Sequence, residues 1–579
     1  MAPSVAIIGA GFGGLCMAIQ LERAGIRSYT VFEKAGDLGG TWRDNSYPGA
    51  GCDIPSHLYS YSFEKYASWT RRYPEQPEIL GYLTHCADKY DVRRKIRFRT
   101  EVRGLVFDGR KWQVSTVSAS PEDSDDWEVA DASAEGEGAA DDDGAAADDG
   151  GGAAADDRGG ATAVASESGG PGGSGGPGAA GGTGGTGPQG WSGPQGWSGA
   201  QGWSGRPGGS GVPGDGEVRT EAFDVVVMGV GQLNRPRLPD IPGMADFDGV
   251  SFHSSRWNHA HDLTGGRVAV IGNGSSAAQF VPHVAEQAEH LYAFQRTPNW
   301  VIPKPDATFG PLTRLAFHYV PGLQRAYREW IYRYAEGTLY PALAQGWSVD
   351  LLRRRALAHL RDQVPDPELR ARLTPDYPPG CKRVVIDSSF YPALTRPNVS
   401  LVTDKIVRMT PEGVQTTEGT YEVDTVIYAT GFKSTEFLVP MRVVGREGRS
   451  LEERWKEGAE AYLGISVPDF PNLFLLYGPN TNLGHNSIIF MIECQVNHIM
   501  ACLPHLAANG PIEVRPEVMA AWRRQLDAAM ARMVWGAECQ SWYKTADGRI
   551  TNNWPGPTTL YRRLTSRPPW PAYRVVGAE

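Results

Sequence analysis

The feature that most constrains the fold is a glycine motif close to the N-terminus. An apolar stretch at 5–8 runs into a G-x-G-x-x-G turn at Gly9, Gly11 and Gly14, and a second apolar stretch ends at Glu33. Gly9 permits the tight turn, Gly11 lets the backbone approach a pyrophosphate, and Gly14 lets the next helix lie close to the strand. The N–H groups at the start of that helix attract phosphates. The motif predicts a parallel α/β dinucleotide-binding fold.

Glu33 has the position of a ribose-binding acid. It lies 19 residues after Gly14, close to the roughly 20 residues expected for a carboxylate that accepts from a ribose hydroxyl. A lone glycine motif is weak evidence, but here strand, turn, helix, second strand and acid occur in order. We therefore expect this first site to hold a dinucleotide with a free ribose.

A second turn of the same kind follows the apolar stretch 267–271. Its residues are Gly272, Asn273, Gly274, Ser275 and, in place of the third glycine, Ala277. Nineteen residues after Ala277 the sequence has Arg296-Thr297 where the first fold has an acid. Arginine binds a 2′-phosphate through charge-assisted hydrogen bonds, whereas an acid repels it. The alternative reading of Arg296 is a solvated arginine at a strand end. FAD at the first site and NADP at the second fit the two patterns.

The overall composition is that of a globular protein without a membrane span. Of 579 residues, 41% are hydrophobic and 21% charged, which is ordinary for soluble domains. No apolar run approaches the roughly 18 residues of a membrane span, and we see no signal peptide. The seven cysteines form no CxxC pair and no metal-ligand spacing, so we expect reduced thiols, a cytoplasmic location and no metal. No basic stripe with interleaved aromatics indicates nucleic-acid binding.

The segment 119–217 differs from the rest of the chain. It contains 18 acidic residues against two arginines and 31 of the 71 glycines, and it repeats GPQGWS-like hexapeptides. Such a composition does not repay the entropy of ordering, so we expect a disordered insertion. The flanks 112–117 and 222–227 both have strand patterns, which favours a long hairpin loop. Tryptophans in the repeats could contact a partner, although a neutral expanded loop is the simpler interpretation.

Four signatures in order carry a resemblance to a known family. They are the two turns, GxWxxxxYPGxxxD from Gly40 to Asp53, and FxGxxxHxxxW from Phe247 to Trp257. Together they resemble the class B flavoprotein monooxygenases, and within these the Baeyer–Villiger monooxygenases, over nearly the whole chain outside the insertion. Asn258 departs from the family, which normally has Pro or Asp there. The sequence around 52–63, 480–493 and 541–562 resembles 4-hydroxyacetophenone-type relatives more than cyclohexanone-type ones.

The resemblance implies a reaction and two catalytic residues. NADPH would reduce FAD, the flavin would add O₂ to give a C4a-peroxyflavin, and this would convert a hydrophobic ketone to an ester or lactone. By motif match Arg383 is the cation that keeps the peroxide deprotonated, and Asp53 orients it. The alternatives are a same-fold enzyme that oxidises nitrogen or sulfur, or a catalytically silent scaffold. Arg383 could also be no more than a structural ion pair at a strand start.

The implied cofactor contacts fall into two groups. For FAD they are Gly9, Gly11, Phe12, Gly14, Glu33, Gly40, Thr41, Trp42, Asp53, Tyr59, Val102, Thr430 and Gly431. For NADP they are Cys52, Gly272, Asn273, Gly274, Ser275, Ala277, Arg296, Thr297 and Lys382. A helix start after 480–487 is a further candidate, because its positive end could stabilise negative charge on a reduced flavin; ordinary capping by Asn486 or Ser487 is the alternative.

We expect an α/β architecture with two Rossmann-like domains, a helical insertion and the disordered insertion. The predicted order is an FAD-binding domain (1–118), the disordered insertion (119–217), a strand and linker (218–261), an NADP-binding domain (262–300), a helical subdomain (301–380), the rest of the NADP-binding domain (381–427) and the rest of the FAD-binding domain (428–579).

Overall fold

The first glycine turn follows the carboxyl end of the central strand of a five-stranded parallel sheet. The computed structural model describes residues 2–119, 217–537 and 541–577. In spatial order the strands are β19 (Leu473–Leu475), β7 (Val225–Met228), β1 (Val5–Ile8), β2 (Tyr29–Phe32) and β3 (Ile96–Arg97). All four residues of β1 are buried, as expected for a strand covered on both faces, which therefore reads as a continuous apolar run.

The second turn follows the carboxyl end of the central strand of a second five-stranded parallel sheet. Its spatial order is β13 (Val399–Val402), β10 (His290–Phe294), β9 (Arg267–Ile271), β17 (Thr425–Tyr428) and β8 (Val250–His253). The register pairs Ile271 with Phe294 and with Tyr428. The two sheets confirm the predicted fold class of two Rossmann-like units.

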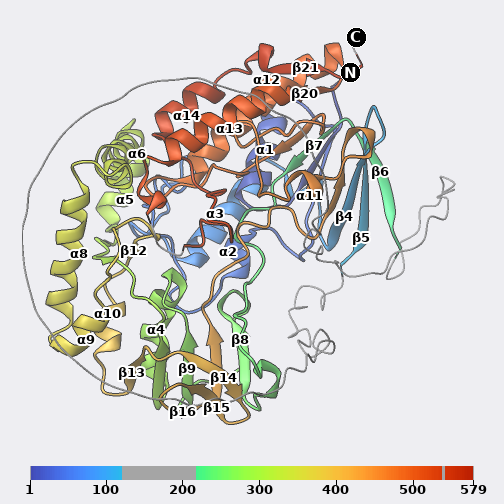
Figure 1. Ribbon diagram of the computed structural model, residues 1–579. Coiled ribbons are helices and arrows are strands. Elements are labelled where there is room, and N and C mark those ends of the chain that lie inside the picture. The colour runs from blue at the N-terminus through green and yellow to red at the C-terminus, as the bar shows by residue number, and fades with distance from the viewer. Residues whose placement is uncertain (1, 120–216, 538–540, 578–579) are drawn as a thin grey trace, which may run out of the picture. The chain divides into compact units, whose positions relative to one another are not determined.

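Each turn opens a helix that packs on its own sheet (Figure 1). α1 (Phe12–Arg23) follows the first turn and packs against α12 (Ile488–Asn509) and α3 (Gln76–Lys89). α4 (Ser275–Gln287) follows the second turn and packs against α10 (Phe390–Leu394). α14 (Thr558–Thr565) lies on the same side as α12, which it contacts.

A smaller sheet joins the two flanks of the predicted insertion. Its order is β18 (Arg442–Val444), β4 (Thr100–Phe107), β5 (Trp112–Ser118) and β6 (Arg219–Phe223). β5 and β6 pair antiparallel from Trp112↔Phe223 to Thr116↔Arg219, as the hairpin reading requires. The rest of the expected disordered insertion and its repeats, 120–216, lies outside the described residues.

The strand pattern predicted over 222–227 belongs to two strands, because the chain changes sheets there. Phe223 ends β6, and Val225 begins β7 of the first parallel sheet. The carboxylate of Asp224 accepts hydrogen bonds from the backbone N–H of Ser4 at 2.8 Å and from its hydroxyl at 2.7 Å. These hydrogen bonds hold the chain at the point where it passes from the small sheet into the first parallel sheet.

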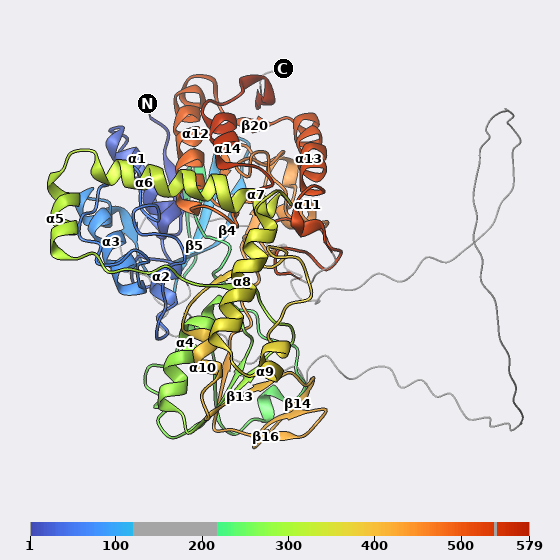
Figure 2. The same ribbon diagram turned by 90° about the vertical axis from the view of Figure 1, so that its left-hand side faces the viewer.

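Helices form most of the segment 306–372, as predicted (Figure 2). They are α5 (Pro311–Tyr319), α6 (Leu323–Tyr334), α7 (Tyr340–Leu343), α8 (Val349–Gln363) and α9 (Pro367–Arg372). A π-helical turn, Ala335–Leu339, links α6 to α7. The remaining elements are α2 (Thr41–Asp44), β11 (Val301–Ile302), β12 (Val385–Ile386), β14 (Ile406–Thr410), β15 (Gly413–Thr416), β16 (Thr420–Glu422), α11 (Leu451–Arg454), β20 (Ile512–Val514), α13 (Pro516–Met530) and β21 (Tyr573–Val575). Among the described residues, no helix combines the length and apolarity that a membrane crossing needs.

Candidate active site

The first glycine turn has the geometry of a phosphate cradle. Gly9 has φ +98°, which a side chain would strain, and a Cβ at Gly14 would lie only 1.8 Å from the carbonyl oxygen of Gly9. α1 begins at Phe12, and its N-cap residue Gly11 offers no side-chain cap. The first N–H groups of the helix therefore remain available to an anion, as a pyrophosphate site requires.

Glu33 is held beside that turn at the end of β2. Its side chain is buried, and its carboxylate accepts hydrogen bonds from the backbone N–H of Ala10 at 2.8 Å and of Ala35 at 3.0 Å. Arg43 Nη1 lies 3.2 Å from Oε1. A carboxylate has about four acceptor positions, so Glu33 retains capacity for a ribose hydroxyl.

The loop after β2 adds aromatic rings next to the turn. Gly40 precedes α2, whose first residues are Thr41 and Trp42. The indole N–H of Trp42 donates to the hydroxyl of Tyr59 at 3.0 Å, and the ring of Tyr59 meets that of Phe12 edge-on at 5.2 Å. The structure thus brings these predicted FAD contacts together around the start of α1.

The second turn is more open than the first at its middle glycine. Gly272 has φ +112°, and a Cβ built on Gly274 would meet nothing within 4 Å. α4 begins at Ser275 without a side-chain cap, and Ala277 is fully buried where the first fold has Gly14. The side-chain amide of Asn273 donates to the carbonyl oxygen of Thr297 at 2.9 Å, which ties the turn to the end of β10.

Two cations converge beside this second turn. The ammonium of Lys382 donates to the hydroxyl of Thr297 at 2.5 Å. Burial lowers the pKa of Lys382, and the charge of Arg296 lowers it further. Arg296 is exposed, and neither cation forms an ion pair within the described part of the chain. An unneutralised Lys–Arg pair at the end of a strand is the donor set that a 2′-phosphate needs.

Arg383 and Asp53 form the pair that the sequence predicted. Nε and Nη2 of Arg383 donate to Oδ2 of Asp53 at 3.1 and 2.5 Å. The negative charge of Asp53 raises the pKa of the Arg383 guanidinium, against the opposing effect of burial. The hydroxyls of Tyr477 and Tyr543 contribute to the same environment, and burial raises the pKa of Tyr543 to about 12. The guanidinium therefore stays charged and is held from one side.

The loop that carries Asp53 is anchored to α4 of the second fold. Gln279 on α4 donates to the carbonyl oxygen of Gly51 at 2.9 Å and accepts from the hydroxyl of Tyr47 at 3.0 Å. Gly49 has φ +76°, and a Cβ there would lie 2.5 Å from the carbonyl oxygen of Gln279. The Tyr-Pro-Gly segment of the sequence signature therefore allows this loop to pack closely against α4.

The F-x-G-x-x-x-H fingerprint lies at β8, next to β17. Gly249 is required by packing, since a Cβ there would lie 2.5 Å from the carbonyl oxygen of Asp424. His253 is fully buried, its Nδ1 meets the hydroxyl of Ser255 at 2.9 Å, and burial lowers its pKa to about 4. The fingerprint therefore has a structural position at the edge of the second sheet.

The other predicted contacts are more dispersed. Val102 is buried in β4, and Cys52 is buried beside Asp53, where the backbone N–H of Ile54 donates to its sulfur at 3.3 Å. Thr430 and Gly431 follow β17 of the second sheet, and Gly431 has φ +83°. The roles of these residues stay predictions.

The expectation that all seven cysteines are reduced was wrong for Cys381. This residue precedes Lys382 and is disulfide-bonded. Disulfide formation depends on separation in space and on Cβ direction, neither of which sequence spacing reveals. Among the described residues, five cysteines are free and buried, and no group of His, Cys, Asp or Glu has the arrangement of a metal site.

Sequence reasoning missed a half-buried carboxylate, Glu336, on the π-helical turn. Glu336 accepts hydrogen bonds from Asn486 Nδ2 at 2.8 Å and from the hydroxyl of Thr558 at 2.5 Å, and His485 Nε2 lies 3.2 Å from it. Although burial opposes ionisation, the hydrogen bond and charge of His485 lower the pKa of Glu336. π-turns often mark functional positions, and this one fixes the loop in front of α12. That helix starts at Ile488, capped by Ser487.

Comparison with known proteins agrees with this geometry. Family models described as an NAD(P)-binding Rossmann-like domain and as flavin-binding monooxygenase-like match residues 7–74 and 212–315. A solved structure of an oxidised steroid monooxygenase bound to NADP has a TM-score of 0.73 at 26% identity, with all of both chains covered. A complex of OTEMO with FAD and NADP has a TM-score of 0.72 at 25% identity, covering 98% of this chain and 97% of that one.

Two relatives that match over nearly their full length are more similar in sequence than these solved structures. A Baeyer–Villiger monooxygenase of Streptomyces coelicolor is 34% identical over 99% of this chain and 92% of its own length. One from Pseudomonas aeruginosa is also 34% identical, over 99% and 91%. Both similarities extend over nearly the whole chain, including the two glycine turns and the region of Arg383 and Asp53. The chain therefore belongs to the Baeyer–Villiger monooxygenase family.

Proposed function

We propose that this protein is an NADPH- and O₂-dependent flavin monooxygenase that converts a hydrophobic ketone to an ester or lactone. When bound, FAD and NADPH supply the electrons and the activation of oxygen. The observation that carries the proposal is the Arg383–Asp53 pair, which follows directly in the chain from Lys382 of the cation cluster. A charged guanidinium thus follows directly in the chain on one of the two cations that would bind a phosphate.

The residues of the two turns fit the two cofactors. At the first turn, uncapped N–H groups and the carboxylate of Glu33 would hold the pyrophosphate and a ribose of FAD. At the second, Arg296 and Lys382 would hold the 2′-phosphate of NADP, while Thr297 positions the ammonium of Lys382. The absence of a carboxylate at this end of β10 favours NADPH over NADH.

Arg383 would stabilise negative charge that develops on oxygen at the flavin. Asp53 binds one side of the guanidinium and leaves other N–H groups free to donate. At a separation of ~4 Å and an effective dielectric constant of ~20, a charge pair contributes about 4 kcal/mol, on the order of 10³ in rate. Asp53 also keeps the guanidinium from turning away, so the stabilisation is preorganised.

The surroundings of the pair would exclude water from the reacting oxygen. Tyr477 is largely buried and Tyr543 almost entirely so, and burial raises the pKa of both hydroxyls. They therefore remain neutral and do not compete for a proton at neutral pH. A water-poor environment suppresses hydrolytic loss of the activated oxygen and strengthens each electrostatic contact.

The test is Arg383→Ala in the purified flavoprotein. Anaerobic NADPH should still bleach the flavin absorbance, since Arg383 is not placed to bind the 2′-phosphate. With oxygen, ester yield from cyclic and aryl ketones should fall on the order of 10³-fold, while NADPH consumption continues and yields H₂O₂. Arg383→Lys should recover only part of the yield, because lysine supplies charge without the planar fork.

The matched control is Arg396→Ala, which removes an exposed arginine that forms no ion pair in the described part of the chain. It should leave ester yield unchanged. Normal ester formation by Arg383→Ala would remove Arg383 from its proposed role. If wild-type protein oxidised sulfides or amines but no ketone, the heteroatom-oxidising alternative would replace this one.

A further inference from the structure

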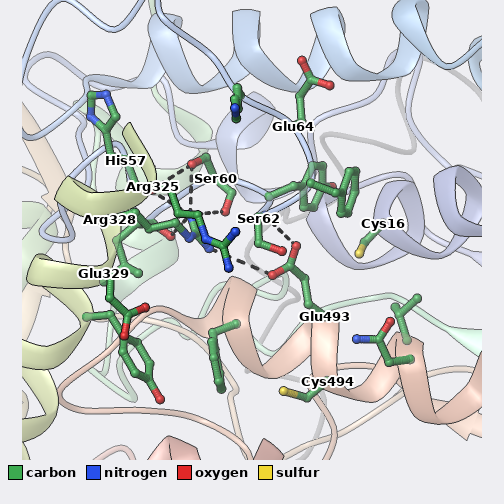
Figure 3. Close-up of a pocket in the computed structure, with 18 of the residues that line it drawn as sticks. Cys16, His57, Ser60, Ser62, Glu64, Arg325, Arg328, Glu329, Glu493 and Cys494 are labelled. Carbon is green, nitrogen blue, oxygen red and sulfur yellow. Dashed lines mark hydrogen bonds and ion pairs between the residues drawn. The ribbon is translucent and has the colours of Figure 1, made fainter. Parts of the chain in front are cut away.

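A cavity of about 810 Å³ is lined by neither Arg383 nor Asp53, and Figure 3 shows part of its lining. Its walls come from α1, the loop 57–69, α6, α12 and α14. None of the residues predicted to hold FAD or NADP lines it. Its volume is in the range of small-molecule sites, roughly 300–1,000 Å³. The cavity therefore needs an explanation other than the two dinucleotide sites.

Two aromatic stacks line this cavity, and each ends in an arginine. In the first, Tyr61 and Phe63 stack at 5.0 Å with an interplanar angle of 8°, and the guanidinium of Arg23 lies 5.0 Å from the centre of the Phe63 ring. Both rings and the arginine belong to the lining. A cation held on a ring is oriented before any ligand arrives.

The second stack repeats the arrangement on other elements. Tyr332 of α6 and Phe490 of α12 stack at 5.2 Å, and the guanidinium of Arg562 on α14 lies 5.3 Å from the centre of the Phe490 ring. All three residues line the cavity. The lining thus offers flat apolar surface with a fixed positive charge at two places.

The charges of the lining do not balance. Its three carboxylates are all engaged: Glu64 by Lys89 at 2.8 Å, Glu329 by Arg333 at 2.8 Å, and Glu493 by the backbone N–H of Ser62 at 2.7 Å. Four exposed cations of the lining form no ion pair within the described residues; they are Arg23, Lys65, Arg325 and Arg562. An uncompensated positive rim over aromatic surface favours an anion.

A half-buried arginine, Arg328, connects two parts of the lining. Arg328 Nη1 donates to the carbonyl oxygens of His57 at 2.7 Å and Ser60 at 2.9 Å, and Nη2 lies 4.0 Å from Glu493. Figure 3 shows its guanidinium between Ser60 and Glu493. These bonds hold the loop 57–60 to α6, so the aromatic walls are positioned without a ligand.

We propose that this cavity binds an amphipathic organic anion, a carboxylate, sulfonate or phosphate joined to a flat aromatic or hydrocarbon body. The body lies against the aromatic stacks, and the anionic group is bound by Arg23 and Arg562. The site is separate from the ketone-oxidising site, and its occupancy does not depend on that reaction.

The test measures binding to the holoenzyme with FAD bound and NADP⁺ in excess, so that both nucleotide sites are filled. 1-Anilinonaphthalene-8-sulfonate is titrated by fluorescence and then displaced with decanoate or with its uncharged counterpart decanol. Decanoate should displace the probe and decanol should not. The affinity for decanoate should fall as salt rises from roughly 20 to roughly 200 mM, because the rim charges are solvent-exposed.

Arg23→Gln and Arg562→Gln should each weaken decanoate binding about tenfold, the loss expected for one charge-assisted contact. Arg563→Gln is the matched control on α14, since Arg563 is exposed and does not line the cavity. FAD content and melting temperature establish that each variant is folded. Unchanged affinity in both variants, displacement by decanol as effective as by decanoate, or no binding of either anion would each overturn the proposal. None of these readouts depends on ester formation.

Discussion

The two glycine turns share one local architecture but differ at the end of the second strand. In the first fold, Glu33 is buried and both of its oxygens accept from the protein. In the second, Arg296 is exposed and forms no ion pair among the described residues. The carboxylate of Glu33 is therefore hydrogen-bonded to the protein, whereas the guanidinium of Arg296 is free to bind an anion. The residue at the end of the second strand, and not the glycine motif, therefore distinguishes the two sites.

The turns also differ in how tightly the helix packs. A Cβ at Gly14 would lie 1.8 Å from Gly9, while the corresponding position of the second fold holds Ala277 without conflict. A Cβ at Gly11 would be in ordinary contact, 3.7 Å from Gly40, and one at Gly274 would meet nothing. The first helix thus lies closer to its strand, and its turn is less tolerant of substitution.

The largest expected effect comes from Gly14→Ala. The added methyl group overlaps the backbone of Gly9, so the helix must move off the strand and the phosphate cradle opens. We expect protein without bound FAD and a destabilisation of several kcal/mol, since overpacking against backbone costs roughly 1–3 kcal/mol or more. Flavin absorbance and thermal unfolding measure both. Gly274→Ala, in open space, is the paired control and should retain FAD and fold normally; equal effects in the two variants would contradict the packing difference.

A smaller effect is expected for Glu33→Gln. The amide oxygen of the glutamine can accept from only one of the two backbone N–H groups, those of Ala10 and Ala35, that Glu33 binds. The NH₂ group then faces the other N–H, which is a donor too, so that buried N–H is left without an acceptor. At about 1–3 kcal/mol for such a group, FAD affinity should fall roughly 10- to 100-fold. Titration of apoprotein with FAD measures this. Glu101→Gln on β4 serves as control, and wild-type affinity in Glu33→Gln would show that the carboxylate does not support the FAD site.

Arg296→Ala tests the second dinucleotide site, and it should weaken the binding of NADPH without affecting that of NADH. Loss of a charge-assisted phosphate contact of about 1.5–3 kcal/mol should raise the Michaelis constant for NADPH roughly 10- to 100-fold. The constant for NADH should change little, because NADH lacks the 2′-phosphate. Steady-state flavin reduction with each cofactor is the measurement. Equal changes for both cofactors would refute the phosphate contact, and flavin content should remain that of wild type.

Part of this site was readable from the sequence because the turns, Glu33 and Arg296 follow from fixed local spacings. The Arg383–Asp53 pair spans 330 positions and was implied by the family resemblance rather than by any local pattern. The missed residues act across long separations: Gln279 meets Gly51, 228 positions away, and Glu336 meets Thr558, 222 positions away. A glutamine or glutamate in a helical pattern is expected to be solvated, and only tertiary packing shows that it is half-buried and hydrogen-bonded.

The smallest effect is expected on replacing 120–216 with a short Gly-Ser linker. β5 and β6 already pair from Trp112↔Phe223 to Thr116↔Arg219, so a tight connection closes the same ladder. If the segment acts as the loop that its composition predicts, each halving of its length contributes about 0.6 kcal/mol of closure entropy. FAD content, NADPH oxidation and ester yield should match wild type, with an equal or slightly higher melting temperature. Loss of bound FAD would show that the first dinucleotide fold, unlike the second, depends on a segment inserted between its own strands.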